Sequence, residues 1–387
     1  MRKLSPVQSV ALMLILRFVY AMNWYNVSPF LTSITGSYSQ GASSSGLILS
    51  AFLLGAGLFQ IPSGFIASRI GARNVALWGM IIMSVSVFLS PLSPDFIVFL
   101  ISRFFVGLAS AFFFSSGIVL LGQIDKRNID GKITMFNVSF AAGGGFGIIL
   151  FGELGRYIQW QPSLYLAGII TIIPSVIALA MIPDPGIRRK TMKGVISKLN
   201  SPLLLLLSFG IAGYWALNLT AVEYLNPYTL FTTGSVNYAG IVGSLALFSG
   251  ILGIFILPFA RKIKPMHING GLVILLSVLV IMIPLVGVIG LGAIALIEGM
   301  FSITIFSAEY YYVVLLEQDE TVVPLSIATM NTIQIGFGSF VAFVFSMIYA
   351  SDKTLAWYAL GFISLITLPL SIPALLKVEK LFPKSSS

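Results

Sequence analysis

The chain contains no cysteine and only one histidine. The first absence excludes disulfide frameworks, thiolate zinc sites, iron–sulfur clusters and cysteine nucleophiles. The single histidine, His267, has no second ligand at a spacing typical of metal sites, so we expect neither a metal nor a cofactor. The sequence also lacks a Gly-x-x-x-x-Gly-Lys-Ser/Thr loop for the phosphates of ATP, so ATP-driven work by this chain alone is not expected.

Charged residues are scarce as well. They make up 9% of the 387 residues, whereas hydrophobic residues make up 57% and the mean hydropathy is +0.98. A soluble domain carries about 25% charged residues, so this composition predicts an integral membrane protein. A membrane-spanning helix needs about 20 mostly apolar residues. The chain offers twelve such runs, at residues 8–30, 45–67, 75–93, 96–121, 134–154, 163–182, 202–224, 237–259, 268–288, 290–316, 323–349 and 354–376.

The gaps between these runs are short and mostly basic on one side. The longest gap, Pro183–Ser201, leaves no room for a soluble catalytic domain, so we do not expect an enzyme. If the N-terminus is cytoplasmic, most of the 22 Lys and Arg residues lie on that side, and only Arg156 and Lys353 lie outside. This asymmetry predicts a multi-pass protein of the cell membrane with both termini in the cytoplasm. The net charge of +9 then reflects topology, and the lipid bilayer rather than nucleic acid is the expected partner.

Glycines and arginines are concentrated between the second and third apolar runs, at Gly64, Arg69, Gly71 and Arg73. Glycines allow a tight reversal with positive φ, and arginines reach lipid phosphates, helix ends or carboxylates. The stretch resembles the gating loop between the second and third helices of major facilitator superfamily (MFS) transporters, with Ser68 where that motif has an acidic residue. We expect a cytoplasmic turn over this whole stretch.

The second six runs repeat features of the first six. Pro29 and the tripeptide Thr35-Gly36-Ser37 recur with the same spacing as Pro227 and Thr233-Gly234-Ser235. Together with the resemblance, this duplication predicts an all-α fold of twelve transmembrane helices in two pseudo-symmetric six-helix bundles. The expected parts are an N-terminal bundle (1–182), a cytoplasmic linker (183–201) and a C-terminal bundle (202–387). The resemblance implies a solute site near the midplane between the bundles.

A charged side chain inside the bilayer is costly enough to need a partner or a task. Arg17 lies within the first run, and Tyr20, Trp24 and Ser28 follow at helical spacing on the same face. A cation, an indole and two hydroxyls suit a carboxylate-bearing or otherwise anionic solute. Alternatively, Arg17 reaches the cytoplasmic interface or pairs with a helix end.

The fourth and fifth runs hold two further patterns. Arg103, followed four residues later by Gly107, resembles the fourth-helix motif of MFS transporters, where the arginine is implicated in proton coupling. A structural ion pair is the alternative for Arg103. Gly143, Gly147 and Gly152 resemble a fragment of an antiporter motif of the same family, and they favour close packing of the fifth helix.

Few carboxylates are available to carry a proton. Glu298 and Glu309 are three helical turns apart, so they project from one face of the tenth run at different depths. A carboxyl group that moves between apolar surroundings and an arginine can load and release a proton. Of the two, Glu298 is the first choice for the proton site. Glu309 is the second candidate, and its alternative is a position at the cytoplasmic interface. Glu223, near the outer end of the seventh run, is interpreted as a gate or a surface residue.

Three amide side chains, Asn218, Asn331 and Gln334, also lie at midplane depth. Buried amides need partners, which either a polar cavity or neighbouring helices supply. The combined pattern favours a monomeric secondary transporter that moves a small organic anion, coupled to protons or another ion, by alternating access. The alternatives are a sugar or drug carrier, favoured by the 13% of aromatic residues, and a non-transporting membrane receptor on the same fold.

Overall fold

The computed structural model describes residues 3–125, 127, 129–185, 201–260, 263–317 and 323–381. Within these ranges every regular element is a helix. The N-terminal half contains α1 (Pro6–Tyr25), α2 (Leu31–Ser37), α3 (Ser45–Leu58), α4 (Gln60–Ile70), α5 (Ala72–Leu89), α6 (Phe96–Ile124), α7 (Ile129–Leu154) and α8 (Trp160–Met181). The C-terminal half contains α9 (Pro202–Thr233), α10 (Val236–Phe248), α11 (Gly250–Ala260), α12 (Leu272–Met282), α13 (Val288–Glu317), α14 (Val323–Ser351), α15 (Lys353–Thr367) and α16 (Ile372–Leu381). Short 3₁₀ or π turns lie at Ser28–Phe30, Ala42–Ser44, Ser90–Leu92, Met266–Gly271, Ile283–Leu285 and Leu368–Ser371.

The helices provide the expected number of membrane crossings. Within the described residues, eleven helical stretches are long and apolar enough to cross a membrane, and α3 with α4 forms a twelfth that bends by 44°. The prediction of an all-α protein with twelve transmembrane helices is confirmed. Several helices extend beyond their apolar runs. The seventh, expected to end at residue 224, continues through Pro227 to Thr233 and ends at Gly234, which has a φ of 64°.

The prediction of a turn over Gly64–Arg73 is wrong for most of its length. Helix α4 continues to Ile70, and the chain reverses only at Gly71, whose φ is 90°. A Cβ added to Gly64 would meet no atom within 4 Å, so this helical glycine serves neither a close approach nor a reversal. No residue between Gly64 and Gly71 breaks a helix, and the helix therefore ends at the one position that requires positive φ.

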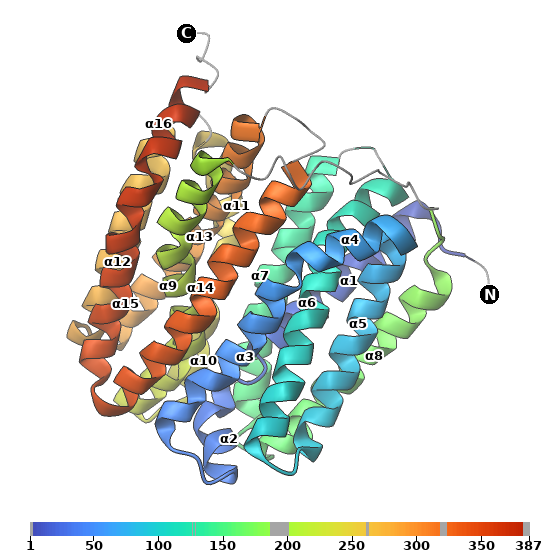
Figure 1. Ribbon diagram of the computed structural model, residues 1–387. Coiled ribbons are helices and arrows are strands. Elements are labelled where there is room, and N and C mark those ends of the chain that lie inside the picture. Colours follow the sequence, from blue (N-terminus) through green and yellow to red (C-terminus); the bar gives the residue numbers. More distant parts are fainter. Residues whose placement is uncertain are drawn as a thin grey trace.

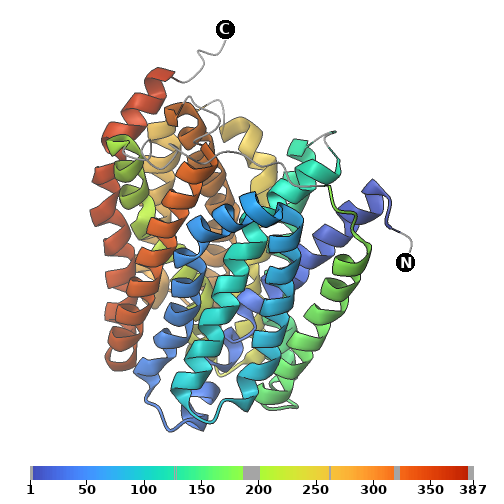
Figure 2. The same ribbon diagram turned by 45° about the vertical axis from the view of Figure 1, so that its right-hand side comes forward.

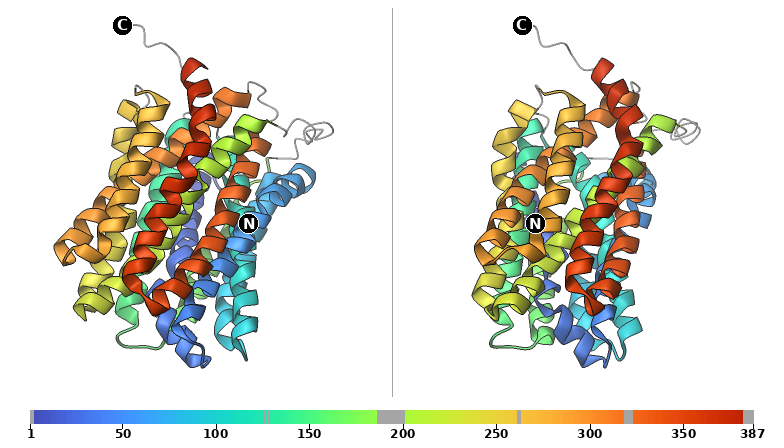
Figure 3. Two further views of the ribbon diagram at one scale, coloured as in Figure 1. Left: turned by 60° about the vertical axis from the view of Figure 1, so that its left-hand side comes forward. Right: turned by 90° about the vertical axis from the view of Figure 1, so that its left-hand side faces the viewer.

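The two halves of the chain lie side by side. In Figure 1 the helices α1–α8, blue to green, occupy the right of the molecule, and α9–α16, yellow-green to red, occupy the left. Figures 2 and 3 show the same arrangement from other sides, with the start of α1 and the end of α16 toward one end of the bundle. We call this the inner end, and the opposite end, where α2 lies, the outer end. Most of the predicted linker, at 186–200, lies outside the described residues.

Glycines allow close helix crossings in the N-terminal half. A Cβ on Gly107 of α6 would collide with the backbone carbonyl oxygen of Phe52 in α3. A Cβ on Gly143 of α7 would collide in the same way with Phe18 in α1. The close packing expected for Gly143 is therefore confirmed, and these crossings position the inward-facing side chains of α1 and α6.

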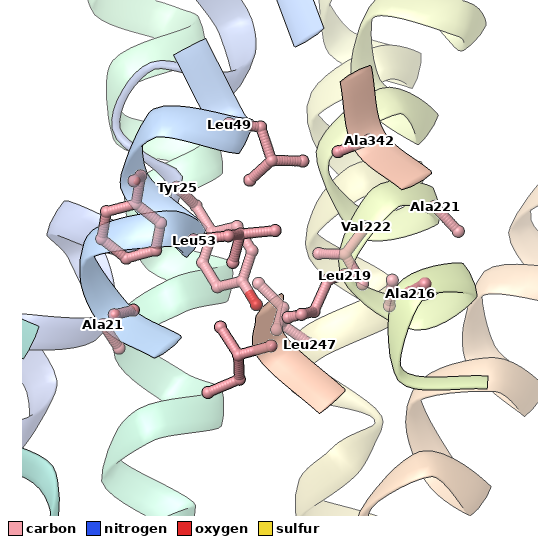
Figure 4. Close-up of a cluster of buried hydrophobic side chains, with 14 of the residues drawn as sticks. Ala21, Tyr25, Leu49, Leu53, Ala216, Leu219, Ala221, Val222, Leu247 and Ala342 are labelled. Carbon is pink, nitrogen blue, oxygen red and sulfur yellow. The ribbon is translucent and has the colours of Figure 1, made fainter. Parts of the chain in front are cut away.

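An apolar cluster joins the two halves. Figure 4 shows Tyr25 and Leu53 of the N-terminal half facing Leu219, Val222 and Leu247 of the C-terminal half, and all five side chains are buried. Helix α1 runs from the inner toward the outer end, so this cluster lies outward of Arg17. It closes the outer side of the cavity that is described next.

Candidate functional site

A cavity of about 140 Å³ lies between the two halves of the chain. Helices α1, α4, α6 and α7 contribute one wall, and α9, α10, α11, α13 and α14 contribute the other. Aromatic and aliphatic side chains form most of the lining, and Arg17 is the only formally charged residue among the described lining residues. The polar lining residues besides Arg17 are Tyr20, Trp24, Tyr25, Gln60, Asn137, Trp215, Asn218, Ser302, Ser307, Tyr310 and Asn331. Such a cavity suits a solute that has an apolar body and one charged group.

Arg17 is held by aromatic rings. Its guanidinium carbon lies 4.4–4.9 Å from the ring centroids of Tyr20, Phe114, Phe136 and Phe140, which come from α1, α6 and α7. Each such contact contributes about 0.5–2 kcal/mol, and planar stacking favours arginine over lysine. The side chain is 4% exposed, and no acidic residue forms an ion pair with it in the described part of the chain. Its Nε and Nη1 donate to no acceptor there, so a buried cation faces the cavity without a counter-ion.

The structure brings together most of the residues assigned to solute binding from the sequence. Arg17, Tyr20, Trp24, Asn218 and Asn331 line the cavity. Gln334 does not, because its side-chain amide points to a buried carboxyl group of α13. Ser28, expected on the Arg17 face, is also absent from the lining. Helix α1 ends at Tyr25, which breaks the helical register, and the Ser28 hydroxyl instead donates to the backbone oxygen of Glu223 at 2.6 Å.

Glu298 lies beside the cavity, on α13. Its Oε1 accepts hydrogen bonds from Asn218 Nδ2 at 3.1 Å and from the Tyr214 hydroxyl at 3.3 Å, both on α9. Its Oε2 has no partner among the described residues, and the side chain is 1% exposed. Asn218 thus touches both the cavity and this carboxyl group. A carboxyl group buried with donors on only one oxygen has a free position for a proton.

Glu309 lies three turns further along α13 and is fully buried within the protein. Its Oε2 accepts from Gln334 Nε2 at 2.8 Å and from Trp215 Nε1 at 3.2 Å, while Oε1 has no partner among the described residues. The next residue, Tyr310, lines the cavity and donates to Asn331 Oδ1 at 3.2 Å. Two consecutive residues of α13 are therefore a buried acid, Glu309, and a cavity residue, Tyr310.

Arg103 belongs to a different part of the molecule. Its Nη1 donates to Asn26 Oδ1 at 3.4 Å, and its guanidinium lies 5.3 Å from the Phe52 ring centroid. Glu223 on α9 lies near Arg103 across the two halves, but its two carboxyl oxygens have no hydrogen-bond partner among the described residues. Glu223 is 1% exposed, so its interpretation as a surface residue is wrong. No contact joins Arg103 to Glu298 or Glu309 within the described residues, so the three predicted proton-coupling residues do not form one cluster.

The predicted gating residues stay within the N-terminal half. Arg73 donates from Nε to the backbone oxygen of Ile182 at 2.9 Å and from Nη2 to that of Leu179 at 2.5 Å. It therefore satisfies carbonyl groups at the carboxyl end of α8, where a cation is favourable. Arg69 is exposed at the inner end. These contacts tie α5 to α8, and the gating role of the four residues stays a prediction.

Sequence reasoning missed two aromatic elements of the site. Trp215 lines the cavity and also bonds Glu309, and it lies three residues before Asn218 on α9. Phe136 and Phe140, spaced four apart on α7, supply half of the rings around Arg17. In both cases the helical spacing was a usable signal, because residues three or four apart share a face. The helical spacing does not show which residues of other helices these aromatic side chains contact.

Comparison with known proteins agrees with this architecture. The family model of the Major Facilitator Superfamily matches residues 13–322. Among curated proteins, "Probable anion transporter 7" of Oryza sativa subsp. japonica is 30% identical over 142 residues, which cover 36% of this chain and 32% of that protein. "Quinolone resistance protein NorA" of Staphylococcus aureus is 26% identical over 229 residues, 54% of each chain. The matches thus span about a third to a half of the length of these relatives.

Solved structures match over nearly the whole chain. A bacterial homolog of the human lysosomal transporter Spinster, in an inward-facing and occupied conformation, has a TM-score of 0.71 at 15% identity and covers 96% of both chains. A mutant form of the nucleoside transporter NupG has a TM-score of 0.72 at 14% identity, covering 97% of this chain and 100% of its own. These likenesses support the fold. With the family match, they establish that the chain belongs to the Major Facilitator Superfamily, a family of membrane transporters and not of enzymes.

Proposed function

We propose that this protein is a secondary transporter for organic anions with an aromatic or other apolar body. The observation that carries the proposal is Arg17, a buried cation that faces the cavity from within four aromatic rings and has no acidic partner there. A sulfonate or carboxylate supplies the missing counter-charge, while the apolar lining accepts its ring. The resemblance over 142 residues to a protein named as an anion transporter agrees with this assignment.

The coupling ion in this proposal is the proton. Glu298 and Glu309 are buried carboxyl groups, each with one oxygen free of partners among the described residues, and each is one contact away from a cavity residue. Protonation removes a charge that is costly to bury. Movement of the anion together with protons also reduces the net charge carried through the apolar interior. One chain encloses the cavity, and we propose a monomer as the transporting unit.

A drug carrier is the second candidate. Trp24, Phe140, Trp215 and Phe306 give the cavity a largely aromatic wall, which accepts apolar molecules of either charge. The partial match to the quinolone resistance protein NorA favours this alternative. The two candidates differ in one respect, because only the first requires a negative charge on the solute.

We place the protein in the cell membrane with its inner end in the cytoplasm. The described basic residues Arg69, Lys132, Lys264 and Lys380 lie on helices or connections at that end, whereas Arg156 lies in the connection between α7 and α8 and Lys353 begins α15, both at the outer end. An excess of Lys and Arg marks the cytoplasmic side. Both the first and the last helix then present their chain ends to the cytoplasm.

Three probes that share a phenyl ring and carry an anionic, a neutral or a cationic head group test the proposed solute class. A ligand that binds only the folded state raises its melting temperature. The purified, detergent-solubilised protein is therefore heated with benzenesulfonate, with neutral benzenesulfonamide or with phenyltrimethylammonium. We expect the anion to raise the melting temperature and the other two to have little effect. Equal stabilisation by all three would contradict the anion assignment and favour the drug carrier.

A further inference from the structure

Trp215 connects the cavity to a buried carboxyl group. Its ring lines the cavity and lies against Phe306 of α13, with the two ring centroids 4.0 Å apart and the planes inclined by 33°. On its other side, Trp215 Nε1 donates to Glu309 Oε2 at 3.2 Å. Glu309 itself does not line the cavity. A solute in the cavity can therefore act on Glu309 only through neighbours, and Trp215 is a cavity residue that donates a hydrogen bond to its carboxyl group.

The hydrogen bonds of Glu309 depend on its charge. An indole N–H is only a donor, and Gln334 also presents its N–H₂ group to the same oxygen. A hydrogen bond to a carboxylate is stronger than one to a neutral group. The Trp215 N–H thus stabilises the ionised form of Glu309 more than the protonated form. Its withdrawal shifts Glu309 toward the protonated acid, with Oε1 as the free position for the proton.

We propose that Trp215 is a positioning residue that couples occupancy of the cavity to protonation of Glu309. A bound anion draws the indole toward the cavity, the N–H leaves Oε2, and Glu309 takes up a proton. Since coupling between two binding sites is reciprocal, protonation of Glu309 frees the indole and strengthens binding of the solute. This inference rests on the proposed function, and it names the side chain through which solute and proton are linked.

Among the hydrogen-bond partners of Glu309, Trp215 is the one whose contact can change with occupancy of the cavity. The titratable groups near Glu309 are Tyr214 of α9 together with Tyr310 and Tyr312 of its own helix. Phenols in general stay neutral between pH 5 and 8. From α14 the facing group is the uncharged Gln334, which is fully buried and does not line the cavity. Within the described residues, no basic side chain forms an ion pair with Glu309.

Proton uptake on solute binding tests the proposal. Benzenesulfonate is added to the purified protein in weakly buffered solution between pH 5 and 8, and protons bound per bound ligand are measured together with the dissociation constant. The ligand stays ionised throughout, so any uptake belongs to the protein. Trp215→Phe keeps an aromatic ring against Phe306 but removes the N–H. Trp357→Phe is the matched control, because Trp357 is a buried indole of the same half that does not line the cavity and whose N–H has no partner among the described residues.

We expect the unaltered protein to take up protons on binding, and its affinity to rise about tenfold as Glu309 becomes protonated, in line with typical coupling between sites. Trp215→Phe should bind benzenesulfonate with several-fold less proton uptake and a flatter pH dependence, whereas Trp357→Phe should keep both. Trp215→Leu, which also lacks the donor, serves if the first variant does not fold. Undiminished uptake in a Trp215 variant that binds would overturn the role of Trp215. Absence of binding or uptake in the unaltered protein would instead overturn the proposed function, and this inference with it.

Discussion

Ser50 and Ser339 bind each other reciprocally across the two halves of the molecule. The Ser50 hydroxyl donates to the backbone oxygen of Ser339 at 2.6 Å, and the Ser339 hydroxyl donates to that of Ser50 at 2.8 Å, which joins α3 to α14. Nearer the outer end, the Ser346 hydroxyl of α14 donates at 2.7 Å to the backbone oxygen of Ser43, in the short turn that precedes α3. Opening of the cavity to the outer side has to break these bonds.

We therefore expect Ser50→Ala with Ser339→Ala to open the outer side more often. Each hydrogen bond contributes about 1 kcal/mol, so loss of the pair should raise the open population roughly thirtyfold. The chain has no cysteine, so Ser302→Cys places a single thiol in the cavity wall, and its reaction rate with an impermeant reagent added outside is the readout. Ser84→Ala is the control, because Ser84 makes a 2.8 Å bond to Gly168 within one half. An equal rise of the thiol reaction rate in Ser84→Ala would contradict the conclusion that the Ser50–Ser339 bonds keep the outer side closed.

Two glycines in helices should respond oppositely to alanine. In Gly107→Ala the new Cβ meets the Phe52 carbonyl oxygen, so we expect a loss of about 1–3 kcal/mol in stability, as for other overpacked sites. In Gly64→Ala the Cβ meets nothing within 4 Å, and the helix should gain up to about 1 kcal/mol. Melting temperatures in detergent compare the two variants. Equal melting temperatures would show that the α3–α6 crossing tolerates a side chain.

Site residues that lie close together in the sequence could be predicted as a group, whereas contacts between distant residues could not. Arg17, Tyr20 and Trp24 could be grouped because they share one face of one helix. Ser28 was misplaced because the end of α1 at Tyr25 has no strong signal, and the turn over Gly64–Arg73 was overextended because glycine is tolerated within a helix.

The remaining contacts join residues far apart in the chain. Trp215 meets Glu309, and Arg103 meets Asn26, only because helices pack side by side. Helical periodicity indicates which face of a helix is buried, but not which residue of another helix lies opposite it. The fold class could therefore be predicted, whereas the partners of Gln334 and Arg103 could not.

Glu298→Gln tests the proton site that was predicted from the sequence. The amide keeps the shape of the side chain and its contact with Asn218, but it cannot take up a proton. We expect the variant to exchange labelled for unlabelled benzenesulfonate in proteoliposomes and to lose accumulation driven by a pH difference. Glu153→Gln, at a half-exposed position paired with Arg156, should behave like the unaltered protein. Accumulation against the gradient by Glu298→Gln would remove Glu298 from the coupling site.

Single cysteines also test the proposed topology. Lys377→Cys lies at the inner end and Gln40→Cys at the outer end, both at exposed positions. In intact cells an impermeant maleimide should label Gln40→Cys at once and Lys377→Cys only after the membrane is opened. The reverse order would place the inner end outside the cell.

The central claim is that the solute is an anion bound through Arg17. The most direct measurement is uptake of labelled benzenesulfonate into proteoliposomes under an inward proton gradient, for the unaltered protein and for Arg17→Gln. The loss of a charged hydrogen bond, about 1.5–3 kcal/mol, predicts an affinity at least tenfold lower in the variant. We predict gradient-driven accumulation by the unaltered protein and its absence in Arg17→Gln. Equal accumulation by the two proteins, or none by either, would contradict the account.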